Sequence, residues 1–113
     1  MKTLRFIVDD QIICKDPTCD FSGLVPGSSG CLSAEFAFSK EWDGCLRVAG
    51  FFSPLGKEYP PRELSYGTSC VIPFEALQKR SFKIQVIGMK TVNGEKVRLK
   101  TNKVVVYQDG GKK

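Results

Sequence analysis

The chain of 113 residues contains no histidine. Histidine titrates nearest to neutral pH and is the most frequent metal ligand, so its absence excludes His-based triads and imidazole metal sites. Carboxylates remain as acid–base groups, but the pairs Asp9–Asp10 and Glu41/Asp43 are more simply explained as turn residues. Because no convergent set of polar residues is visible, the sequence predicts a protein that is not an enzyme and that binds no metal or cofactor.

Disulfide and zinc frameworks are also missing from the sequence. Its five cysteines stand at irregular spacings and include no Cys-x-x-Cys pair: Cys14, Cys19, Cys31, Cys45 and Cys70. An odd count argues against a secreted disulfide scaffold, and a zinc site would need four scattered thiolates. We therefore expect reduced thiols that pack as small apolar side chains, with oxidation of Cys14 and Cys19 across the turn between them as the alternative.

Long apolar runs are absent as well. No stretch approaches the roughly 18 apolar residues that a membrane-spanning helix needs. Residues 1–10 alternate like a strand and show no basic segment followed by an apolar core and a cleavage site, so we expect neither a membrane span nor a signal peptide. With 42% hydrophobic and 26% charged residues, the composition is typical of one soluble domain.

Positive charge is unevenly distributed along the chain. Residues 1–75 carry seven Lys and Arg against ten Asp and Glu, whereas residues 76–113 carry ten against two. The basic half is compatible with a nucleic-acid face, with a dock for an acidic protein surface, or with the solvated outer face of a sheet.

The clearest structural pattern lies around the only tryptophan. Apolar residues alternate with polar ones from Leu32 to Phe38, which indicates a strand with one buried face. Trp42 and an Asp-Gly turn follow, and a second apolar strand runs to Phe52. Two strands that share one large aromatic corner make a core landmark, so we expect Trp42, Phe36 and Phe38 to anchor the core.

Short alternating strands are expected along the rest of the chain as well. They cover residues 3–8, 11–14, 69–72, 82–86, 97–99 and 104–107, with Asn93-Gly94 as a strong hairpin turn. Residues 21–30 have a loop composition, and Pro73 opens one short helical turn over residues 73–79. This pattern predicts an all-β fold: a single antiparallel β-sandwich, immunoglobulin-like or jelly-roll-like, over residues 1–108, followed by a flexible polar tail at 109–113.

Two sets of residues are candidate partner contacts. The first is basic and lies on the alternating C-terminal strands: Lys83, Lys96, Arg98 and Lys100. We expect these side chains on one side of their strands with no aromatic beside them, which disfavours single-strand nucleic acid because such binding uses stacked aromatics. The second set is apolar and lies in the turn-rich segment 53–63, where it contacts a partner or covers one end of the core: Leu55, Tyr59, Pro60 and Pro61.

Several motifs in this order resemble a known module. They are Phe36-x-Phe38-Ser-Lys-Glu-Trp42-Asp43-Gly44, Phe51-Phe52, Cys70-x-Ile72-Pro73-x-Glu75-x-Leu77, Phe82-x-Ile84-x-Val86-x-Gly88 and Arg98-Leu99-x-Thr101-Asn102-x-Val104-x-Val106. Together they resemble the small β-sandwich module of virion proteins from phages and prophages of Gram-positive bacteria. This module occurs in baseplate upper proteins and in head or tail fibre proteins. The resemblance covers roughly residues 3–108.

The resemblance implies a structural role. In such proteins the module attaches a larger receptor-binding or fibre region to the particle and carries no catalytic residues. It implies a virion protein made in the bacterial host cytoplasm, partnered by capsid, tail or baseplate proteins and by copies of itself. The chain ends shortly after the module, so a decoration role on capsid or tail stands beside the fibre role. The runner-up is a small nucleic-acid-binding barrel of the oligonucleotide-binding type.

Overall fold

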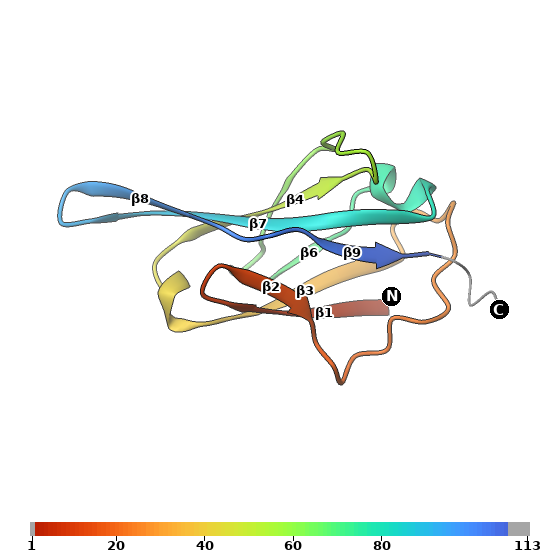
Figure 1. Ribbon diagram of the computed structural model, residues 1–113, viewed down its shortest axis with the longest axis horizontal. Helices are drawn as coiled ribbons and strands as arrows, with labels where there is room; N and C mark the ends of the chain where they lie inside the picture. The colour runs from red at the N-terminus through yellow and green to blue at the C-terminus, as the bar shows by residue number, and fades with distance from the viewer. Residues whose placement is uncertain (1, 109–113) are drawn as a thin grey trace.

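Two β-sheets pack face to face in the computed structural model, which describes residues 2–108 (Figure 1). Sheet A has four strands, in the order β2 (Ile12–Lys15), β1 (Lys2–Asp9), β3 (Leu32–Phe38) and β6 (Ser69–Val71). Sheet B has five, in the order β5 (Arg62–Glu63), β4 (Leu46–Phe52), β7 (Ser81–Val92) and β8 (Glu95–Lys100), with β9 (Val104–Tyr107) also paired to β7. This confirms the all-β sandwich. The predicted flexible tail, 109–113, lies outside the described residues.

One ladder departs from the antiparallel pattern predicted from the sequence. Strands β1 and β3 run parallel, with Arg5 opposite Glu35 and Phe6 opposite Phe36. The chain makes a tight β1–β2 hairpin and then returns through the long loop at residues 16–31, where Lys2 donates its backbone N–H to the carbonyl of Cys31. Because that loop carries the chain back past the start of β1, β3 begins at the same end as β1 and must run beside it in the same direction.

The core follows the alternation read from the sequence. Side chains that point between the sheets are almost fully buried, among them Leu4, Phe6, Val8, Ala34, Phe36, Phe51, Phe82, Ile84 and Val86. Trp42 has no exposed surface, and its indole N–H donates to the carbonyl of Asp10 at 2.6 Å. Phe38 is only partly buried and packs at a tilt between Trp42 and Phe36, with ring centroids 5.2 and 6.0 Å away. Phe38 therefore extends the core toward its margin and does not lie at its centre.

Short 3₁₀ turns are the only helical elements among residues 2–108. The predicted turn after Pro73 is η2 (Phe74–Gln78), and a second one, η1 (Lys40–Trp42), was not predicted from the sequence. Within the described residues no helix is long and apolar enough to cross a membrane. The η1 turn positions Trp42 in the core. It redirects the chain at the end of β3 so that the indole lies between the two sheets.

Strands β8 and β9 are parts of one strand that is interrupted at residues 101–103. Thr101 stays bonded to β7 through both its backbone and its side chain: its N–H donates to Val86 O at 3.1 Å, and its Oγ1 accepts from Val86 N–H at 3.0 Å. The interruption turns the next residue, Asn102, toward sheet A, where it bonds the backbone of Ile13. The gap predicted between the strands at 97–99 and 104–107 is confirmed. Within this gap, Asn102 links sheet B to sheet A.

Candidate docking surface

The outer face of sheet B presents two rows of side chains across neighbouring strands. Strand register places Leu46 beside Met89 and Met89 beside Arg98, and it places Val48 beside Ile87. Ile87 in turn pairs with Lys100. Since adjacent strands lie about 4.8 Å apart, each row is continuous. We call this surface, centred on Leu46, Val48, Ile87 and Met89, the sheet-B face.

Two shallow hollows lie on the sheet-B face. One, of about 410 Å³, is lined by Leu46, Met89, Lys90, Thr91, Lys96, Val97 and Arg98. The other, of about 430 Å³, is lined by Val48, Gly50, Glu58, Pro61, Ile87, Met89 and Arg98. Leu46 and Met89 are about half exposed, at 52% and 49%. Aliphatic side chains in open hollows suit burial by another protein surface, because that contact would remove them from water.

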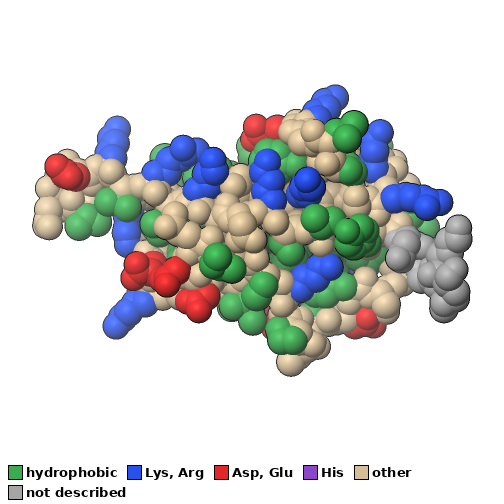
Figure 2. Space-filling model, in the orientation of Figure 1, with side chains coloured by type: hydrophobic (Ala, Val, Ile, Leu, Met, Phe, Trp, Pro, Cys, Tyr) green, Lys and Arg blue, Asp and Glu red, His purple; other side chains and the backbone are tan. Residues whose placement is uncertain are grey.

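The structure brings residues from both predicted contact sets to this face. Pro61, from the turn-rich segment, and Arg98, from the basic strands, line the same hollow. Lys96, Arg98 and Lys100 lie on one side of β8, as predicted, and Figure 2 shows Lys and Arg side chains gathered over β7 and β8. Sequence reasoning did not connect the two sets, because their proximity depends on how β5 and β8 flank β4 and β7.

Charge is not uniform across the sheet-B face. Lys96, Arg98 and Lys100 form a basic margin on β8. Glu63 pairs with Val48 from β5, and Glu58 lines the hollow on the same side, so these two form an acidic margin opposite. Among residues 2–108 one ion pair is present, Arg5–Glu35, on sheet A. The charges on both margins of the sheet-B face therefore have no ionic partner among the described residues.

Lys83 lies on the same side of β7 but further along the strand, beside Phe52 and Val105. The expectation that no aromatic shares the basic side is wrong. Phe52 lies there, nearly buried, with the ammonium of Lys103 4.0 Å from its ring centroid, and Tyr107 is 60% exposed at the end of β9. Both lie away from the basic margin on β8, so they do not build a stacking platform with Lys96, Arg98 and Lys100.

The turn-rich segment divides into exposed and buried residues. Leu55 is 99% exposed beside a hollow of about 420 Å³ that Ser53, Pro54, Lys57, Tyr59 and Lys79 also line. Pro60 is exposed, as is Pro61. Tyr59 is the exception: only 9% of it is exposed, and its N–H donates to Phe51 O at 2.8 Å. Tyr59 therefore fits the alternative reading of this segment, that it covers one end of the core, because strand-like pairing with β4 folds its ring onto the core.

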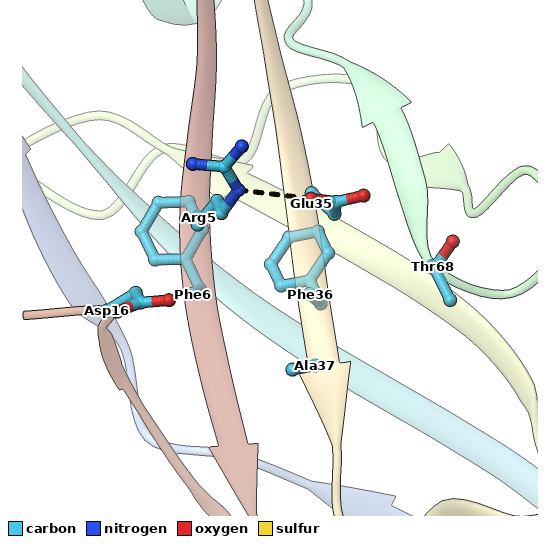
Figure 3. A pocket seen from close by; sticks show the side chains of 7 residues that line it. All are labelled: Arg5, Phe6, Asp16, Glu35, Phe36, Ala37 and Thr68. Atoms are coloured by element: carbon cyan, nitrogen blue, oxygen red, sulfur yellow. Dashed lines mark ion pairs between the residues drawn. The ribbon is translucent and has the colours of Figure 1, made fainter. Parts of the chain in front are cut away.

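Sheet A offers a weaker candidate. A hollow of about 250 Å³ lies over β1 and β3, where the Arg5–Glu35 pair spans 3.4 Å (Figure 3). The pair follows from the parallel register, and its side chains are 55% and 51% exposed. Beneath it lie the backbones of strands whose aromatic side chains face the core. A half-exposed ion pair on a flat sheet contributes little to stability and offers no convergent group for chemistry.

The cysteines are spread over the molecule. All five thiols are free; Cys14 and Cys31 are exposed and Cys70 is buried. Burial raises the pKa of the Cys70 thiol to about 11, partly opposed by the charge of Arg62. Within the part of the chain that the structure describes, no group of three or more Cys, Asp or Glu is placed to hold a metal ion.

No protein-family model, no curated protein and no solved structure matches this chain. We therefore infer function from the sheet-B face itself and from the motif resemblance.

Proposed function

We propose that this protein is a structural component of a phage particle: a protein–protein attachment or decoration module of the capsid, tail or baseplate. It would be made in the cytoplasm of the bacterial host and act as a homo-oligomer in the virion. The motif resemblance supports the assignment to a phage particle. The outer surface of the sandwich supports a role in attachment. The proposed role requires no catalytic chemistry.

The observation that carries the proposal is the sheet-B face. Its centre is aliphatic, with Leu46 and Met89 half exposed in adjoining hollows. A rim of unpaired charges surrounds that centre. Protein interfaces commonly have this anatomy of apolar middle and polar rim. A small-molecule site would instead be concave and enclosed, and these hollows are open and shallow.

A second contact is available at one end of the sandwich. Leu55 projects into solvent from the turn that follows β4, beside Pro54 and Lys57. Ser53 stabilises this turn, because its Oγ accepts from Lys57 N–H at 2.9 Å and its N–H donates to Lys57 O at 2.8 Å. A turn held in this way presents a large apolar side chain with little ordering cost on binding. This end suits attachment to a different virion protein.

The runner-up function fits the architecture less well. A nucleic-acid-binding module of the oligonucleotide-binding type is a small barrel, and sheets A and B are two packed sheets with separate strand orders. The aliphatic centre of the sheet-B face also lacks the aromatic side chains on which unpaired bases stack. Basic charge remains the one feature shared with that class.

The test of the proposal is mass spectrometry of density-purified particles from an induced lysogen that encodes the chain. The protein is expected in stoichiometric amount with capsid or tail proteins. Particles produced with Leu55→Asp should lose it, whereas Tyr66→Asp, an equally exposed change that lines neither the sheet-B face nor the hollow beside Leu55, should not affect incorporation. Absence of the wild-type chain from particles that contain every other structural protein would rule the proposal out.

A further inference from the structure

We propose that the sheet-B face binds a second copy of this chain about a twofold axis that runs parallel to β7. The inference deepens the proposed function, on whose docking face it rests, by naming the partner of that face. It depends on the order of side chains across the sheet.

Across the strands the order is acidic, aliphatic, basic. Glu63 on β5 pairs with Val48 on β4, Val48 with Ile87 on β7, and Ile87 with Lys100 on β8. Glu63 and Lys100 are three strand spacings apart, roughly 14 Å, which is too far for an ion pair within one chain. Glu58 and Arg98 also line one hollow, but they are offset along the strands, because Glu58 pairs with Phe52 and Arg98 pairs with Met89.

This order is self-complementary. When two copies pack face to face about an axis parallel to β7, the β5 margin of each copy lies over the β8 margin of the other. Glu63 of each copy then meets Lys100 of the other, and the aliphatic centres meet each other. A twofold contact is satisfied by any surface that matches itself in this reciprocal way.

Other occupants fit less well. A uniformly acidic partner, or a nucleic acid, would place negative charge against Glu58 and Glu63. A twofold axis perpendicular to the strands would superpose like margins. Strand addition at the β8 edge is opposed by its own composition, because Lys96, Arg98 and Lys100 are the residues that protect free edges from pairing.

The far end of the face limits the contact. Lys83 lies beyond Gln85 and Gly50, and Lys103 covers Phe52 there. Packed sheets cross at about 30° and diverge away from their centre. A contact centred on Val48 and Ile87 therefore leaves Lys83 and Lys103 at the rim, where solvent screens their repulsion.

Charge reversal tests the arrangement directly. Purified wild-type protein should sediment as a dimer in a concentration series by analytical ultracentrifugation. Arg98→Glu/Lys100→Glu makes both margins acidic, and Glu58→Lys/Glu63→Lys makes both basic. Each variant should dimerise at least about tenfold more weakly, since the Glu63–Lys100 contact becomes a like-charge contact at both margins. All four positions are exposed, so thermal denaturation should show both variants folded.

Recovery is the decisive outcome. Mixing the two variants in equal amounts should produce a heterodimer by native mass spectrometry, and the chain carrying all four reversals should recover the homodimer. Lys57→Glu/Lys79→Glu, two reversals outside the face, should leave dimerisation unchanged. A monomer at all concentrations, or reversals that are not rescued by mixing or by combination, would overturn the inference.

The two proposals fail separately. A monomeric chain that is still found in purified particles overturns the twofold contact alone. A reciprocal dimer that is absent from particles overturns the virion role alone.

Discussion

The side-chain amide of Asn102 pairs with the backbone of Ile13. The N–H of Ile13 donates to Oδ1 at 2.8 Å, and Nδ2 donates to the carbonyl of Ile13 at 3.3 Å. One side chain thus satisfies both outward-facing groups of Ile13 on β2 and joins sheet A to sheet B. At this position β2 has no free backbone group for an added strand, so any association by strand addition must use another edge.

Replacement of Asn102 should weaken the joint between the sheets. We expect Asn102→Ala to lower the free energy of unfolding by about 1–3 kcal/mol, because Ile13 loses both hydrogen bonds at a partly buried place. Urea denaturation followed by tryptophan fluorescence measures it. Gln11→Ala is the matched control, since it removes only an exposed bond of 3.2 Å to Lys100 O and should cost far less. Equal effects of the two changes would contradict the assignment.

Trp42 should be indispensable for folding. It is fully buried, with its indole N–H bonded to Asp10 O, so Trp42→Ala leaves a large cavity and an unpaired carbonyl. We expect a loss of about 3–5 kcal/mol. Small domains have only about 5–15 kcal/mol in total, so the variant should be mostly unfolded near 37 °C by circular dichroism. A variant that melts within a degree of the wild type would refute the anchoring role.

Gly88 should tolerate no side chain. A Cβ built there would lie 2.7 Å from the Trp42 ring and 3.2 Å from Cys45 Cβ, both closer than normal contact. We expect Gly88→Ala to cost about 1–3 kcal/mol in the free energy of unfolding through overpacking. Gly50→Ala on the adjacent strand is the control, because its Cβ would meet the edge of the Phe52 ring at 3.2 Å on the outer face, where the ring can shift. A larger cost for Gly50→Ala would be evidence against this packing.

The thiols should separate by exposure and by pH. Denatured protein made in the bacterial cytoplasm should titrate as five free thiols, and three or fewer would indicate a native disulfide. In the folded protein at pH 8, Cys14 and Cys31 should react fast with a chromogenic disulfide reagent, whereas Cys70 should react only on unfolding, since burial raises its pKa to about 11.

The same shift sets a dependence of stability on pH. Unfolded Cys70 ionises near its usual pKa of 9.0, while the folded thiol keeps its proton until about pH 11. The unfolded state therefore binds fewer protons in this window, and the contribution of Cys70 to stability should fall as pH rises from about 9 toward 11. Cys70→Ala should flatten that decline in pH-dependent thermal melts. An unchanged slope would show that other groups cause it.

Local patterns in the sequence were sufficient to predict the sandwich. Two-residue alternation located the buried faces of β1, β3 and β7, and Asn93-Gly94, with a left-handed Asn93 at φ 51°, made the hairpin turn. The parallel pairing of β1 with β3 was not accessible in this way. It depends on where the loop at residues 16–31 returns the chain, and loop composition does not encode that direction.

The candidate site was predictable in part. The basic residues of β8 and the exposed Leu55 follow from strand alternation and turn composition. Burial of Tyr59 does not, because it results from pairing with Phe51 that only the folded β4 permits. The acidic margin was missed for a similar reason: Glu58 and Glu63 reach the basic strands only through the order β5-β4-β7-β8.

Nucleic-acid binding by the basic strands should be weak and salt-sensitive. Lys96, Arg98 and Lys100 attract phosphates, but Phe52 is nearly buried under Lys103 and Tyr107 lies at the far end of sheet B, so bases have no platform beside the basic margin. Binding would then be carried by counterion release alone, and its affinity should fall steeply between about 50 and 200 mM salt. Fluorescence anisotropy with a labelled single-stranded oligonucleotide measures this. Micromolar or tighter binding that persists at physiological salt, and that Tyr107→Ala abolishes, would show that stacking occurs and would favour the nucleic-acid function over docking.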